Sequence, residues 1–201
     1  MDAQGFQAAT GASDAALADL ERYRQMLEEG NAVMNLVGPA TLPDFWSRHA
    51  LDSAQLRDHA PDARTWADLG AGAGLPGVVL AILLKGVEGA RVWLIDSQTK
   101  RCRFLQQVVD ALALPAEVVD ARAETLRIKA DVVTARACAP MDRLLDFADP
   151  YLKRGALGLF LKGEQAEAEL AEARRRRPRL DADLLPSVSD PRGRIVRIRS
   201  L

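Results

Sequence analysis

The sequence predicts an α/β fold built around an open, mostly parallel sheet. Between residues 65 and 177, short apolar runs alternate with stretches of helical periodicity, which is typical of βα units. Towards the C-terminus this rhythm gives way to two strand-like runs joined by SDPRG, and these turn residues predict a closing hairpin. We therefore expect a seven-stranded sheet whose last strand is antiparallel.

The N-terminal part predicts a helical cap on this sheet. Residues 1–12 are small and polar, and we expect them to be a frayed, disordered tail. Ser13 is a suitable N-cap for a helix that ends at Gly30 and Asn31, and a second helical stretch covers 42–58. The expected organisation is a tail, a cap over 13–60 and a core over 61–201, with cap and core forming one compact unit.

The remaining elements follow from the alternating pattern. The strand-like runs are 65–69, 91–95, 117–119, 131–135, 157–161, 184–188 and 193–199, and the helices between them are 78–84, 99–112, 141–152 and 164–177. The helix at 99–112 gathers its apolar side chains on one face, as a helix packed on a sheet does.

Composition limits the possible functions. With 201 residues and 48% hydrophobic content, the chain can bury roughly 70% of its extended surface. The net charge of −1 leaves no global basic field, so a nucleic-acid contact requires a local patch. Cys102 and Cys138 form neither a metal motif nor a disulfide framework. We expect a cytoplasmic protein with reduced thiols, no metal and no membrane segment.

The stretch DLGAGAGLPG, residues 68–77, follows an expected strand and opens an expected helix. Its glycines fit two spacings, GxGxG over 70–74 and the dinucleotide pattern GxGxxG over 72–77. A glycine-rich turn at this place lets a ligand approach the backbone closely. The alternative is a tight strand-to-helix turn without a ligand.

Two carboxylates flank this loop. Asp96 ends the next strand, where an acid can accept hydrogen bonds from ribose hydroxyls. Asp68 would repel a pyrophosphate and suits a ligand with a sulfonium and an ammonium group, which favours S-adenosylmethionine over NAD. The alternative for Asp68 is that it only caps the loop backbone.

Six blocks, in order along the chain, resemble the ribosomal small-subunit methyltransferase G family, also called glucose-inhibited division protein B. They are RHALDS, DLGAGAGLPG, LIDSQTKRCRFL, ARAETL, TARACAP and LKGEQAEAEL, and the resemblance runs from about residue 35 to the C-terminus. It implies a class I methyltransferase fold of Rossmann-like type, S-adenosyl-L-methionine as the cofactor, and methylation of N7 of one guanosine in 16S rRNA.

The resemblance also implies cofactor-binding residues, namely Gly70, Leu75, Asp96, Ala123, Glu124 and Arg136. Asp68, Gly72, Gly74 and Ser97, in or beside the glycine loop and the end of the next strand, complete the residues that we expect to bind the cofactor. Arg136 is also expected to align the substrate, with Lys162 as a second candidate for this role, and no other catalytic residue is assigned. The alternative for Arg136 is an ion pair with Glu124 or Asp142 that only braces the loop.

The chemistry implied by the resemblance needs few side chains. The sequence has no Ser-His-Asp or Cys-His constellation, and guanine N7 has a lone pair that needs no deprotonation, so proximity and orientation suffice. The RNA-binding candidates are Arg48, His49, Lys100, Arg101 and Lys162. The alternatives are a solvated helical turn for Lys100 and Arg101, and a buried imidazole that bridges cap and core for His49. The run Arg174–Arg179 ends a helix that begins with acids, so it complements the helix dipole and is not assigned to RNA.

Two other functions remain open from the sequence. One is an NAD-dependent oxidoreductase that uses Gly72, Gly74 and Gly77, and the other is a non-catalytic ribosome-binding protein that keeps the cofactor fold. The expected partner is 16S rRNA in the small ribosomal subunit or its precursor, with no obligate protein partner. The sequence does not distinguish naked rRNA from a particle, and it does not give the oligomeric state.

Overall fold

The computed structural model describes residues 1–201 and contains one seven-stranded sheet in the order β3-β2-β1-β4-β5-β7-β6. The strands are β1 (Thr65–Leu69), β2 (Arg91–Asp96), β3 (Ala116–Asp120), β4 (Val132–Arg136), β5 (Leu157–Lys162), β6 (Asp181–Pro186) and β7 (Arg194–Ser200). The pairs among β1 to β5 are parallel, whereas β7 runs antiparallel to both β5 and β6. The predicted mostly parallel sheet with an antiparallel last strand is confirmed.

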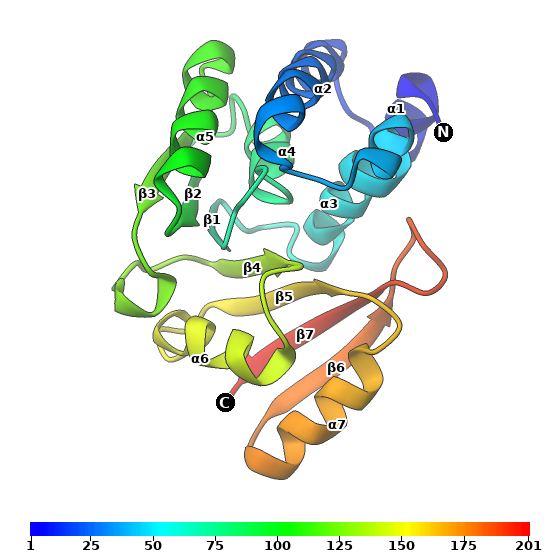
Figure 1. Cartoon of the computed structure of the whole chain (residues 1–201). Coiled ribbons are helices and arrows are strands. Elements are labelled where there is room, and N and C mark those ends of the chain that lie inside the picture. The colour runs from blue at the N-terminus through cyan, green and yellow to red at the C-terminus, as the bar shows by residue number, and fades with distance from the viewer.

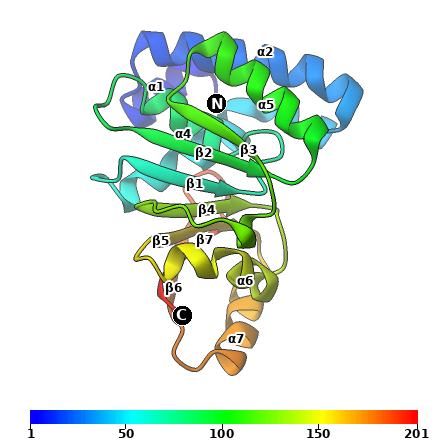
Figure 2. The same ribbon diagram turned by 90° about the vertical axis from the view of Figure 1, so that its left-hand side faces the viewer.

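Helices cover both faces of the sheet. On one face lie α4 (Gly77–Leu83), α5 (Thr99–Leu112) and the N-terminal cap, and on the other lie α6 (Met141–Leu152) and α7 (Ala166–Arg176). Figure 1 shows the two groups of helices on opposite sides of the strands, and Figure 2 shows the same layers from the side. Buried side chains of β1 point alternately to the two faces of the sheet, and both faces therefore need covering helices. Trp66 belongs to the core on the cap side, and Ala67 belongs to the core beneath α6.

The cap begins earlier than predicted. Residues 3–10 form α1 (Ala3–Thr10), and the expectation of a frayed tail over 1–12 is wrong. Phe6 is fully buried, and its ring centroid lies 5.5 Å from that of Trp46. A single aromatic anchor therefore orders a segment whose composition resembles that of a disordered tail.

The first long cap helix is α2 (Asp14–Met34), and Ser13 caps it by accepting a 3.2 Å hydrogen bond from the Ala16 N–H. The helix continues past the predicted end at Gly30 and stops at Asn35, which adopts the left-handed conformation. Gly30 serves packing, because a Cβ there would lie 2.9 Å from the Phe104 ring.

The second predicted cap helix is an irregular succession of turns. It consists of η1 (Pro39–Asp44), the π-helix η2 (Phe45–Leu51), α3 (Asp52–Ala54) and η3 (Gln55–His59). The π-helical turn carries Arg48 and His49, and such turns frequently lie at functional sites. Cap and sheet share one hydrophobic cluster, which includes Leu20 and Tyr23 of the cap and Trp66 of β1. The boundary at residue 60 stays a prediction.

Candidate active site

The loop between β1 and α4 lies at the carboxyl ends of the parallel strands, where the sheet order turns from β1 towards β2 on one side and β4 on the other. Gly70, Gly72 and Gly74 have φ values of +64°, +57° and +98°, which favour glycine. At Gly70, a Cβ would also lie 2.5 Å from the Cys138 Sγ. The glycines therefore give this loop its conformation.

Asp96 fixes the loop from the end of β2. Its Oδ2 accepts a 2.9 Å hydrogen bond from the Gly72 N–H, and its Oδ1 accepts a 2.8 Å hydrogen bond from the Gln98 N–H. The Arg101 guanidinium lies 3.8 Å from the same carboxylate. Because a carboxylate offers about four lone-pair sites, Asp96 can still accept hydrogen bonds from a ligand.

Asp68 lies fully buried beneath the loop. Its Oδ2 accepts a 2.9 Å hydrogen bond from the N–H of Gly77, the first residue of α4, while its Oδ1 has no partner. Burial raises the pKa of this carboxyl to about 7, although the Gly77 N–H and the Arg136 charge act in the opposite direction. The capping role considered as an alternative is therefore present, and one oxygen remains uncommitted.

Two cavities meet at this loop. The larger, of about 760 Å³, is walled by the cap, the glycine loop, the ends of β4 and β5 and the β6–β7 hairpin, and the smaller, of about 410 Å³, lies beside the end of β2. They share Gly70, Arg101 and Ala137. Together they form a two-part site with room for an elongated ligand.

Most of the predicted site residues line these cavities. The larger cavity contains Arg48, His49, Gly70, Gly72, Leu75, Arg101, Arg136 and Lys162, and the smaller contains Gly70, Asp96, Ser97, Arg101, Ala123 and Glu124. Asp68, Gly74 and Lys100 line neither; Asp68 lies under the loop and Lys100 is exposed on α5. The assignment of these side chains to cofactor and RNA stays a prediction.

Arg136, at the end of β4, contacts the cap. Its Nη1 donates a 3.0 Å hydrogen bond to the Arg48 carbonyl and lies 3.5 Å from the Asp52 Oδ2, and its Nη2 lies 3.1 Å from the His49 Nδ1. The predicted brace partners Glu124 and Asp142 are wrong: Glu124 lies 3.8 Å from Arg122, and Asp142 pairs with Arg176 and Arg177. The true partners are more than 80 residues away along the chain, which no local pattern reveals.

These contacts fix the tautomer and the charge of His49. A guanidinium only donates, so the Nδ1 of His49 accepts, and its Nε2 carries the proton and donates to the Thr41 Oγ1 at 2.9 Å. Thr41 then donates to the Gly38 carbonyl at 2.7 Å. Burial, followed by the charges of Arg136 and Arg48, lowers the pKa of His49 to about 3. His49 is thus a neutral imidazole that bridges cap and core.

Lys162 lines the larger cavity from the end of β5, but it is already engaged. Its Nζ forms a 2.7 Å ion pair with Glu169 and donates a 3.1 Å hydrogen bond to the Ala139 carbonyl. Glu169 also accepts from the Met141 N–H at 2.8 Å. Lys162 therefore braces β5 against the starts of α6 and α7.

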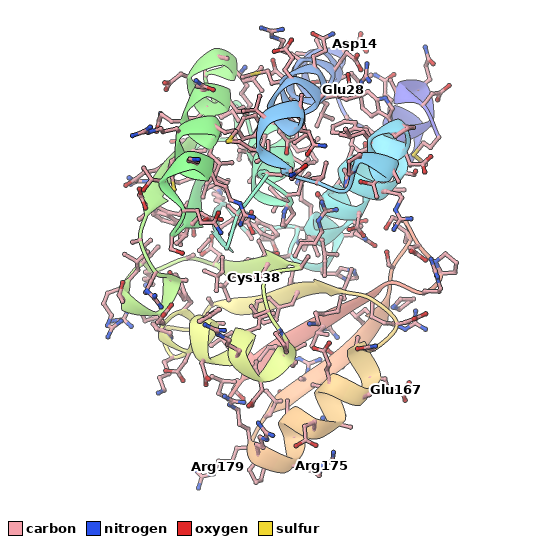
Figure 3. All side chains as sticks on the ribbon, in the orientation of Figure 1. Asp14, Glu28, Cys138, Glu167, Arg175 and Arg179 are labelled. Carbon is pink, nitrogen blue, oxygen red and sulfur yellow. The ribbon has the colours of Figure 1, made fainter.

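Three arginines of the run at the end of α7, Arg175, Arg176 and Arg177, form ion pairs at the surface. Arg175 pairs with Glu172, and Arg177 lies 2.6 Å from Asp146 in addition to pairing with Asp142. In Figure 3 the labelled Arg175 and Arg179 lie at the outer end of α7, away from Cys138 near the centre. This arrangement agrees with the helix-dipole interpretation.

Sequence reasoning missed Asp52. Its Oδ1 accepts hydrogen bonds from the Ser189 hydroxyl at 2.6 Å and from the Gln55 amide at 3.0 Å, while its Oδ2 faces Arg136. Asp52 thus connects the cap, β4 and the β6–β7 hairpin around one cavity. The only available signal was its place in the RHALDS block.

Fold and site together define a class I S-adenosylmethionine-dependent methyltransferase fold. A methyltransferase from Aquifex aeolicus, described as SAM dependent, superposes with a TM-score of 0.62 at 17% identity, covering 84% of this chain and 97% of that one. The SAH-bound Podospora anserina methyltransferase PaMTH1 gives a TM-score of 0.62 at 13% identity, covering 94% and 88%. No helix of the structure is long and apolar enough to cross a membrane, and no group of His, Cys, Asp and Glu side chains is arranged to hold a metal ion.

The sequence identifies the family within this class. The model of the rRNA small subunit methyltransferase G family matches residues 16–186. A relative from Caulobacter sp. (strain K31) is 63% identical over 201 residues, covering all of this chain and 90% of the relative, and one from Caulobacter vibrioides (strain NA1000 / CB15N) is 60% identical, covering 93% of its length. Both are named Ribosomal RNA small subunit methyltransferase G. The chain belongs to this family, as its six sequence blocks predict.

Proposed function

We propose that this protein transfers a methyl group from S-adenosylmethionine to N7 of a guanosine in the 16S rRNA of the small ribosomal subunit. The observation that carries the proposal is the pair of cavities that share Gly70, with Asp96 lining the smaller and Arg136 lining the larger. The names of the family and of its relatives supply the substrate.

The residues present fit the cofactor. Asp96 would accept hydrogen bonds from the ribose hydroxyls with the lone pairs that its backbone donors leave free. Ala123 and Glu124 would lie against the adenine in the smaller cavity, and the loop from Gly70 to Leu75 would hold the methionine end. The uncommitted Oδ1 of Asp68 beneath the loop suits a cationic ligand and not a pyrophosphate, which disfavours the NAD alternative.

The bound cofactor supplies an electrophilic methyl group on a good leaving group, and the protein aligns the acceptor with it. His49 cannot act as a base, because both of its nitrogens are hydrogen-bonded and its pKa is about 3. Arg136 makes three contacts with the cap, which leaves at least two of its five N–H donors free for a guanine O6 or a phosphate. An acceptor that needs no deprotonation, such as N7, matches this site.

The substrate would approach the open side of the larger cavity. Arg48 and Arg101 line this cavity, and the exposed Lys100 neighbours Arg101 on α5. These cations form the local patch that a chain of net charge −1 needs to bind RNA. We infer action in the cytoplasm on the small subunit or its precursor.

The test has two parts. S-adenosylhomocysteine should raise the melting temperature of the protein and NAD should not, since a ligand of the native state stabilises it. Small subunits from a strain without the enzyme, incubated with labelled S-adenosylmethionine, should then show cleavage at one N7-methylguanosine of 16S rRNA. Stabilisation by NAD alone would support the oxidoreductase, and cofactor binding with no methylation of any rRNA preparation would support the non-catalytic binder.

A further inference from the structure

The chain has two tyrosines, and both donate their buried hydroxyl to a backbone carbonyl. The Tyr23 hydroxyl lies 2.8 Å from the Ala73 carbonyl oxygen, and the Tyr151 hydroxyl lies 3.0 Å from that of Ala123. Both side chains are completely buried. Burial raises the pKa of each phenol above its ordinary value, so both remain protonated donors.

The two accepting carbonyls belong to the two different cavities of the site. Ala73 lies in the glycine loop and lines the larger cavity, whereas Ala123 begins η4 (Ala123–Thr125) and lines the smaller one. The donors come from opposite layers, since Tyr23 is in the cap helix α2 and Tyr151 is in α6 (Figure 1). Each layer of helices thus donates one hydrogen bond to the backbone that lines one of the two cavities.

We propose that Tyr23 and Tyr151 are positioning residues, which set the backbone of the methionine end and of the adenosine end of the cofactor site respectively. This inference rests on the placement of the cofactor proposed above. It also assigns the cap a role in cofactor binding, because Tyr23 links it by a hydrogen bond to the glycine loop.

The mechanism is preorganisation. Ala73 lies between Gly72 and Gly74, which both have positive φ values. Glycine restricts backbone rotation less than any other residue, so the peptide groups on either side of Ala73 can change orientation easily. A buried carbonyl that loses its donor seeks another partner, and the loop then spends part of its time in conformations that do not bind. Apparent affinity falls in proportion to the competent fraction.

The experiment compares Tyr23→Phe and Tyr151→Phe by calorimetry with two ligands, S-adenosylhomocysteine and 5′-methylthioadenosine, which lacks the amino-acid portion. Tyr151→Phe should weaken both ligands by roughly three- to tenfold, as expected for one hydrogen bond. Tyr23→Phe should weaken S-adenosylhomocysteine by a similar factor and leave 5′-methylthioadenosine unchanged. A general loss of stability would weaken the two ligands equally, so it could not produce this difference between them.

Thr134→Val is the matched control. Thr134 is fully buried, and its hydroxyl donates a 2.7 Å hydrogen bond to the Leu159 carbonyl, which lines neither cavity. The control should lower the melting temperature and bind both ligands normally. If both tyrosine variants behave like the control, the proposal is overturned while the proposed function stands; if the wild-type protein fails to bind S-adenosylhomocysteine, both are overturned.

A second measurement uses the wild-type sequence and needs no variant to fold. Protein labelled with 3-fluorotyrosine should give two fluorine resonances, one for each tyrosine. S-adenosylhomocysteine should shift both resonances and 5′-methylthioadenosine only one. Two resonances that are unmoved by saturating S-adenosylhomocysteine would contradict the proposal.

Discussion

The carboxylates of the site and those of the α6–α7 surface are held in different ways. Asp68 and Asp96 are buried and accept from backbone N–H groups, which leaves oxygen lone pairs free. Asp142 and Asp183 lie at the surface and pair with arginines. Backbone donors fix a carboxylate without neutralising it, whereas the surface acids are already matched and screened. The site carboxylates therefore retain the capacity to bind a ligand, and for Asp68 burial makes this costly for stability.

Asp68→Asn should have the largest effect on stability, and the difference in free energy of unfolding between variant and wild type should depend on pH. Burial raises the pKa of Asp68 to about 7 in the folded state, above its ordinary value of 3.8, so the stability that its protonated form contributes is full below pH 3.8 and is lost as the pH rises through 7. Asparagine keeps an acceptor for the Gly77 N–H and does not ionise. Relative to wild type, the variant should gain on the order of 3 kcal/mol in free energy of unfolding between pH 5 and pH 8.

Asp142→Asn provides the contrast, measured by urea unfolding over the same pH range. Arg177 and Arg176 lower the pKa of the Asp142 carboxyl, so its contribution is present above the unfolded value and is lost only in acid. The difference from wild type should stay constant between pH 5 and pH 8. A flat profile for Asp68→Asn as well would remove the proposed distinction between the two kinds of carboxylate.

The sequence could predict the elements that position the site, because they follow from local pattern. Helices α5 and α6 and strand β1 have their predicted bounds, since apolar periodicity acts over short distances. The failures depend on distant contacts. Phe6 is ordered by Trp46, the π-helical turn follows no recognised pattern, and Arg136 meets a helix from the cap. The types of the site residues were predictable, but their hydrogen-bond partners were not.

Asp96→Ala tests the other site carboxylate. It removes an acceptor for ribose hydroxyls together with the acceptor for the Gly72 and Gln98 N–H groups. S-adenosylhomocysteine should bind about 1.5–3 kcal/mol more weakly, which is roughly tenfold to a hundredfold. Asp120→Ala is the control, because Asp120 pairs in register with Asp96 at the end of the neighbouring strand and is exposed. Calorimetry giving equal affinities for the two folded variants would refute the assignment.

Arg136→Lys separates bracing from substrate contact. Lysine keeps the charge, but one ammonium cannot reach the Arg48 carbonyl and His49 and also bind the substrate with a planar fork. We expect methylation to fall by about tenfold or more with S-adenosylhomocysteine affinity almost unchanged. Arg103→Lys, on the exposed side of α5, should methylate normally. If Arg136→Lys methylates at the wild-type rate, Arg136 is only a brace, and Lys100, Arg101 or Lys162 becomes the candidate for substrate contact.

The smallest expected effects compare cations in the two regions at equal charge. Arg48→Ala with Lys100→Ala removes one positive charge from the lining of the larger cavity and one from the exposed neighbour of Arg101 on α5. Arg175→Ala with Arg179→Ala removes two from the outer end of α7 (Figure 3). If the RNA lies over the cavity, only the first pair contacts phosphates. The slope of log K against log salt should then decrease by about 1 for each lost contact, and affinity at low salt should fall several-fold. The α7 pair should leave the slope, the affinity and the methylation rate at wild-type values, because neither arginine lines the cavity and Arg175 already pairs with Glu172. The measurement is filter binding of small subunits over a range of salt concentrations.

Equal losses for the two double variants would mean that the RNA covers α7 as well, and the arginine run would then belong to the substrate surface despite its ion pairs.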